Sequence, residues 1–126
     1  MTSWLSRLSY AIGVITILSG AFQLLAAPWE LELLAAQNGL ASTHFFRIIG
    51  MFMVLFGGML THALSRPEPR DLVVLWTALQ KFGASAAVGL GVLTAVFSPL
   101  ALLVAGFDLA SALVLIAYRR TLQTHA

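Results

Sequence analysis

Two charged residues, Lys81 and Asp108, stand inside a long apolar part of the chain. The 26 residues between them carry no charge. A charge at the centre of a membrane-spanning helix costs at least about 2.5–3.5 kcal/mol, so such residues usually face the protein interior and find a partner there. A buried acid can pair with a base, share a proton, or take part in an ion or ligand site. We therefore expect Asp108 to be either paired or protonated.

Lys81 and two further polar residues, Arg47 and Gln23, could lie near Asp108 in the folded protein. Lys81 is level with Asp108 when positions are counted from the charged ends of the two segments. Counted from the turn at Ser98, however, the two residues are offset by roughly 10 Å at helical rise. Lys81 could therefore pair with Asp108 or extend its ammonium toward the membrane surface. Arg47 could reach Asp108, or it could extend to Glu30 or Glu32. Gln23 lies near the same level as Arg47. We expect Arg47, Gln23, Asp108 and Lys81 to form a polar column, which could hold the helices in register or bind a ligand or ion.

Several kinds of chemistry have no support in the sequence. The chain has no cysteine, which excludes disulfides, thiolate metal sites and iron–sulfur clusters. His44 and His62 would lie five helical turns apart, whereas two haem ligands need one depth on facing helices. No nucleophile with a base and no metal cage is visible. The net charge is only +2, without the basic cluster that nucleic acid needs. We expect a protein that is not an enzyme and has no cofactor, metal or nucleic-acid partner.

The composition requires a lipid environment. Hydrophobic residues make up 60% of the chain and charged residues 10%, whereas a soluble domain carries about 25% charge. The mean hydropathy is +0.92. A membrane helix needs about 20 apolar residues, and Ser98–Pro99 is a helix-start pattern that divides the last apolar stretch. The expected spans are 5–26, 45–64, 72–97 and 100–118.

We predict one domain, residues 1–126, with an all-α fold: an antiparallel four-helix transmembrane bundle. Short connections place successive helices side by side. The segment 28–43 between the first two spans has Leu31 and Leu34 on one helical face, with Glu30 and Glu32 at the surface. This pattern indicates a short interfacial helix, and a plain polar loop is the alternative. The first span is longer than the apolar core of a signal peptide, about 7–15 residues, so we expect a retained anchor.

Positive charges predict the orientation in the membrane. Basic residues gather on the cytoplasmic side of membrane proteins. In a four-span thread, five of the six arginines fall on one side: Arg7, Arg66, Arg70, Arg119 and Arg120. Both termini should therefore be cytoplasmic. An aromatic belt is expected at the two interfaces, with Trp4, Trp76 and Tyr118 inside and Trp29 outside.

Small residues indicate where helices approach closely, because helix contacts in lipid depend on close backbone approach. In the third span they recur every fourth residue, at Gly83, Ala87, Gly91 and Ala95. Seven-residue glycine spacings occur in the first two spans, at Gly13 and Gly20 and at Gly50 and Gly57. The opposite face of the third span carries a polar stripe, Thr77, Lys81 and Ser85. We expect the four-residue ladder to pack against another span, another copy or a different subunit.

These features resemble small four-span bacterial inner-membrane proteins of the DoxX-like kind. The resemblance lies in "RLSYAIGVITILSGAFQLLAAP" of the first span, "FFRIIGMFMVLFGG" of the second, and Lys81, Gly83 and Asp108. It implies a four-helix fold in a bacterial inner membrane and no dependable activity. Gln23 stands where related chains often have a lysine.

Two functions are consistent with the sequence. The first is a small structural or accessory subunit that packs against another membrane protein or a second copy of itself. The missing catalytic groups and the small-residue ladder favour it. The alternative is a protein that binds or transports a lipid, quinone or ion at the Arg47, Asp108 and Lys81 column.

Overall fold

The computed structural model describes residues 2–124 and is all-α, as predicted. It contains five α-helices and one short 3-10 helix. Four of the α-helical segments are long and apolar enough to cross a membrane. The elements are α1 (Thr2–Leu25), α2 (Ala27–Leu33), α3 (Leu40–Leu64), α4 (Asp71–Leu93), the 3-10 helix η1 (Pro99–Ala101) and α5 (Leu102–Thr124). The predicted four-helix bundle is confirmed.

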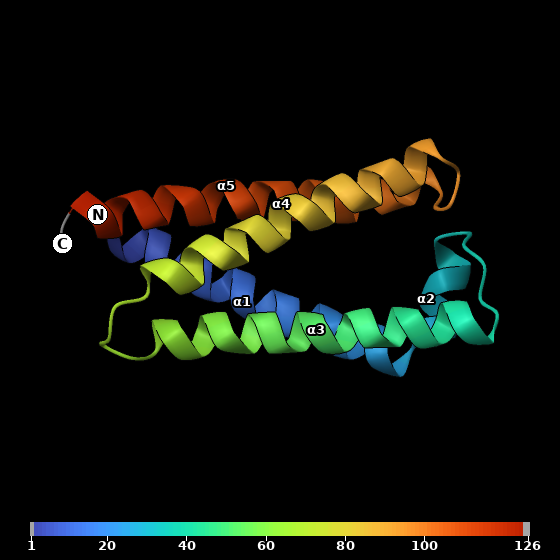
Figure 1. Ribbon diagram of the computed structural model, residues 1–126, viewed down its shortest axis with the longest axis horizontal. Coiled ribbons are helices and arrows are strands. Elements are labelled where there is room, and N and C mark those ends of the chain that lie inside the picture. The colour runs from blue at the N-terminus through green and yellow to red at the C-terminus, as the bar shows by residue number, and fades with distance from the viewer. Residues whose placement is uncertain (1, 125–126) are drawn as a thin grey trace.

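The bundle consists of two helix pairs that run along its long axis (Figure 1). Helices α1 and α3 form one pair, and α4 and α5 form the other. Both termini and the α3–α4 loop lie at one end, which we call the terminal end. Helix α2 and the α4–α5 turn lie at the opposite end, which we call the α2 end. Successive long helices are therefore antiparallel.

Glycines bring α1 and α3 into backbone contact. A Cβ added at Gly20 would lie 2.6 Å from the Gly50 carbonyl oxygen, and one added at Gly57 would lie 2.7 Å from the Gly13 carbonyl oxygen. Both distances are too short for any side chain, so each position requires glycine. Gly13 and Gly20 in α1 have the same seven-residue spacing as Gly50 and Gly57 in α3. Because the helices are antiparallel, Gly20 meets Gly50 and Gly13 meets Gly57.

The half of the bundle near the terminal end has a closed apolar core. Residues from all four long helices form it: Leu5, Ile12, Leu60, Val74, Ala78, Leu115 and Tyr118. The prediction that Tyr118 joins an interfacial belt was wrong, because its ring is only 3% exposed and packs in this core. Trp4, Trp76 and Trp29 are exposed.

Helix α4 ends at Leu93, four residues before the predicted limit of the third span. Ala95 follows in a left-handed conformation, with φ of 61°, and the amides of Val96 and Phe97 both bond to the Gly91 carbonyl. The Phe97 ring folds back over Gly91, where a Cβ would lie 2.7 Å from it. Ala95 therefore belongs to a turn and not to the helix.

A short helix, α2, does follow the first span, rather than a plain loop. Pro28 lies in its first turn, and Ala27 and Leu31 are buried. Beyond it, the Ser98 amide donates a 2.8 Å hydrogen bond to the Leu34 carbonyl, which ties the α4–α5 turn to the end of α2. Helix α3 then begins at Leu40, five residues earlier than predicted.

Candidate functional site

Lys81 and Asp108 form an ion pair in the middle of the bundle. The Lys81 Nζ lies 3.3 Å from Asp108 Oδ1, and the two residues are 2% and 8% exposed. Of the two alternatives for Lys81, the structure has the pair and not an ammonium extended to the surface.

The early end of α4 explains why the two residues are level. Lys81 lies about 18 Å from Leu93 along α4 at 1.5 Å per residue. Asp108 lies about 15 Å from the start of η1, because the 3-10 turn rises about 2.0 Å per residue. The offset of roughly 10 Å expected from a longer third span is therefore largely removed.

Lys81 also binds α1 through a residue that the sequence analysis missed. Its Nζ donates a 2.7 Å hydrogen bond to Thr16 Oγ1, and the Thr16 hydroxyl donates to the Ile12 carbonyl at 2.7 Å. The ammonium lies 5.4 Å from the centre of the Phe107 ring. One side chain thus connects α1, α4 and α5.

A sequence signal for Thr16 was available. Ser9, Thr16 and Gln23 lie seven residues apart in the first span, and all three are buried. A seven-residue repeat keeps side chains on one face of a helix. Only Gln23 of the three was predicted as a site residue, because Gln23 lies near the level of Arg47.

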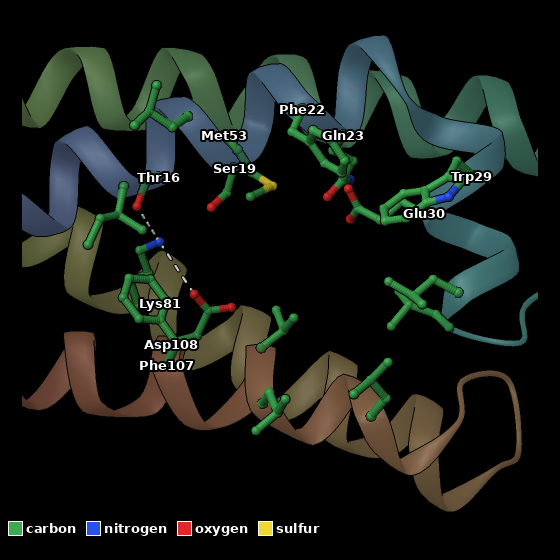
Figure 2. A pocket seen from close by; sticks show the side chains of 17 residues that line it. Thr16, Ser19, Phe22, Gln23, Trp29, Glu30, Met53, Lys81, Phe107 and Asp108 are labelled. Atoms are coloured by element: carbon green, nitrogen blue, oxygen red, sulfur yellow. Dashed lines mark hydrogen bonds and ion pairs between the residues drawn. The ribbon is translucent and has the colours of Figure 1, made fainter.

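The ion pair forms the floor of a cavity in the half of the bundle near the α2 end (Figure 2). Its volume is about 630 Å³. Helices α1, α2 and α5 surround it, while α3 and α4 contribute only Met53 and Lys81. Most lining side chains are apolar, and those at the opening are exposed: Leu18, Phe22, Trp29, Leu33 and Leu103. In a bilayer this opening faces the acyl chains.

Four polar groups besides Lys81 and Thr16 line the cavity. Asp108 uses Oδ1 for the ion pair, and Figure 2 shows its other oxygen directed into the open interior, as is the Ser19 hydroxyl. Gln23 lies toward the α2 end, where its side-chain amide donates to the Phe46 carbonyl at 2.9 Å. Glu30 lies at the end opposite the ion pair. Partial burial raises the pKa of the Glu30 carboxyl above its usual value.

The structure brings Lys81, Asp108 and Gln23 to one cavity, but it leaves Arg47 outside. Arg47 does not line the cavity, and its side chain makes no hydrogen bond or ion pair with any residue that the structure describes. The expected column therefore lacks its arginine. Arg47 lies in the second turn of α3, and this helix contributes only Met53 to the cavity.

The small-residue ladder of α4 faces outward. Gly83 and Ala87 are exposed, and a Cβ at Gly83 would meet no atom within 4 Å. The polar stripe on the opposite face points inward: Thr77 and Lys81 are buried, and Ser85 donates to the Ala105 carbonyl of α5 at 2.9 Å. The glycine-mediated backbone contacts are thus between α1 and α3, and α4 packs against α5 through its other face.

Comparisons with known proteins add no name to this site. No family model matches the chain, and no curated protein or solved structure is significantly similar to it. Within the described residues, no group of three or more histidine, aspartate or glutamate side chains could hold a metal ion. The chemistry of the cavity is that of a binding site, with apolar walls and polar groups at both ends.

Proposed function

We propose that this protein binds a small amphipathic lipophile, such as a lipid or quinone, inside the membrane. The observation that supports the proposal most is the ion pair at the floor of a cavity that opens sideways. An ion pair that served only to fix helix register could be fully enclosed by packed side chains and would need no cavity beside it. Here one Asp108 oxygen borders a space of about 630 Å³ whose walls are mostly apolar, and a polar atom that acyl chains covered without a hydrogen-bond partner would cost about 1–3 kcal/mol. The polar head of a ligand would supply that partner.

We further propose a bacterial inner membrane, a DoxX-like relationship and cytoplasmic termini. The arginine distribution supports the orientation, since Arg7, Arg66, Arg70, Arg119 and Arg120 belong to the terminal end. The cavity would then lie in the outer half of the bilayer. Its ligand would enter from the outer leaflet between α1 and α5.

A matched pair of tryptophan variants tests the proposal. Val104 lines the cavity, whereas Leu113, on the same helix and similarly exposed, does not. Native mass spectrometry of the protein extracted gently from its membrane should detect a bound small molecule in the wild type and in Leu113→Trp. Val104→Trp should lose it. Retention by Val104→Trp, or an empty wild-type cavity after gentle extraction, would contradict binding.

An accessory subunit is the second candidate function, and the outward small face of α4 favours it. Gly83 and Ala87 would allow close approach of another helix in lipid, from a different protein or a second copy. Extraction in lipid nanodiscs should then recover an oligomer or a partner, and Gly83→Leu should dissociate it. A strictly monomeric wild type would contradict the accessory-subunit function and leave the proposed ligand binding standing.

A further inference from the structure

We propose that the amphiphile is a small organic cation: a protonated amine on a compact apolar body. This inference rests on the proposed binding function and specifies the class of ligand. It comes from the charges that a molecule inside the cavity would meet.

The positive charge of the cavity is not available to a ligand. Lys81 is the only basic residue among those that line it, and it is 2% exposed. Its ammonium donates to Thr16 and Asp108 and lies against the Phe107 ring. An acidic head group would find no free cation among the described lining residues.

The negative charges, in contrast, are directed at the cavity from both ends. The second oxygen of Asp108 points into the interior from the floor, and Glu30 lies at the opposite end (Figure 2). The Glu30 carboxylate makes no hydrogen bond or ion pair with the residues that the structure describes. Two carboxylates against one shielded ammonium would repel an anion strongly in a space of low dielectric. A cation would be attracted and would also donate hydrogen bonds.

Aromatic rings line the cavity at the Glu30 end. Trp29 precedes Glu30 in the chain, and its ring packs edge to face against Phe22, with ring centres 5.6 Å apart. The Phe107 ring, by contrast, already lies against the Lys81 ammonium. Ring faces attract organic cations, and the attraction grows when water is excluded. The remaining apolar walls suit a hydrocarbon body, and the volume of about 630 Å³ accommodates a bicyclic ring with a short side arm.

Three probes of the same shape test the charge preference: 1-naphthylmethylamine, 1-naphthylmethanol and 1-naphthoate. Binding is measured by calorimetry in phosphatidylcholine nanodiscs at pH 7. Nanodiscs with Val104→Trp measure the partitioning of each probe into lipid, and subtracting this signal leaves the binding that depends on the cavity. We expect the amine to bind at least 10-fold more tightly than the alcohol, and the carboxylate to show no binding above the blank. Glu30→Gln, at a half-exposed position where folding is not at risk, should weaken the amine at least 5-fold and leave the alcohol unchanged. Asp108→Asn leaves Lys81 without its counter-ion, so its binding is compared after circular dichroism shows native helix content, and the folded variant should also weaken the amine at least 5-fold.

The outcomes separate the ligand class from the binding function. Equal binding of amine and alcohol, or preferred binding of the carboxylate, would overturn the cation inference and leave the binding function standing. An amine affinity that survives both Glu30→Gln and Asp108→Asn would also overturn it. If none of the three probes binds above the Val104→Trp blank, the inference and the proposed binding function both fail.

Discussion

The Lys81–Asp108 pair contributes both to stability and to the cavity. Each side chain neutralises the charge of the other, which neither lipid nor an apolar core could do, and one Asp108 carboxylate oxygen remains exposed to the cavity. Stability and binding therefore depend on the same two side chains in different ways, which variants can separate.

Removing one partner should destabilise the fold more than removing both. Lys81→Met or Asp108→Leu leaves an unpaired buried charge, and we expect each to lower the free energy of unfolding by about 3–5 kcal/mol. The double variant Lys81→Met/Asp108→Leu should recover most of that loss, because two apolar side chains replace the pair. Denaturant unfolding in detergent micelles measures all three.

The double variant also tests whether the pair has a role beyond structure. We expect it to fold and to lose the amine probe. A folded double variant that still binds the amine would reduce the pair to a purely structural element. A double variant as unstable as the sum of the two single variants would contradict the pairing itself.

Glu30 should make stability depend on pH. Because burial raises the pKa of its carboxyl in the folded protein, its contribution to stability is fully present below the unfolded pKa, about 4.3, and is lost as pH rises through the higher folded pKa. Glu30→Gln should therefore be more stable than the wild type at pH 7 and equal to it near pH 4. Thermal unfolding across this range measures the difference. Glu32→Gln, which removes the exposed neighbouring acid, is the matched control for the loss of one carboxylate.

At the scale of the elements, close backbone packing holds α1 to α3. A seven-residue step along one helix matches a seven-residue step back along the other, so Gly20 meets Gly50 and Gly13 meets Gly57. This matched spacing was visible in the sequence. The ladder on α4 was emphasised instead because it is longer, but its spacing could not say which face of α4 points inward.

Glycine substitutions should separate the two kinds of small residue. Gly20→Ala places a Cβ 2.6 Å from the Gly50 carbonyl oxygen, and we expect a loss of about 1–3 kcal/mol from overpacking. Gly83→Ala meets no atom within 4 Å and should gain about 0.5–1 kcal/mol from better helix propensity. Unfolding in micelles compares the two directly. An equal effect of both substitutions would contradict the α1–α3 packing.

The elements also show what sequence could and could not predict. The apolar lengths placed the ends of the four spans to within about six residues, and Ser98–Pro99 marked the start of the last helical segment. The Lys81–Asp108 pair could be expected because the cost of an isolated charge in lipid leaves few options. Rotation of each helix about its axis could not be predicted, since lipid-facing and interior positions are both apolar. Arg47 and Tyr118 were misplaced for that reason, whereas the seven-residue repeat of Ser9, Thr16 and Gln23 could have indicated Thr16.

Over the whole molecule, the two halves of the bundle differ. The terminal end has a closed apolar core. Near the α2 end the helices surround a cavity, and the Ser98–Leu34 hydrogen bond joins the α4–α5 turn to the end of α2. The cavity was not predictable because it arises from where α4 stops and where α2 folds back, and both depend on turns far apart in the sequence.

Single cysteines can test the orientation, since the chain has no native cysteine. Asn38, in the loop at the α2 end, and Ser65, in the loop at the terminal end, are both exposed. In intact cells, an impermeant maleimide should label Asn38→Cys and spare Ser65→Cys until the membrane is opened. The reverse pattern would place the cavity in the inner leaflet.

Photolabelling tests the central claim most directly, which is that a lipophile occupies the cavity above the Lys81–Asp108 pair. A neutral fatty alcohol carrying a diazirine would be photolysed with the protein in nanodiscs, and the labelled residues mapped by mass spectrometry. We expect labels concentrated at Leu103, Val104 and Phe107, removed by excess unlabelled alcohol and absent from Val104→Trp. Labels spread evenly over lipid-facing residues such as Leu79 and Leu113, with no competition, would contradict the claim.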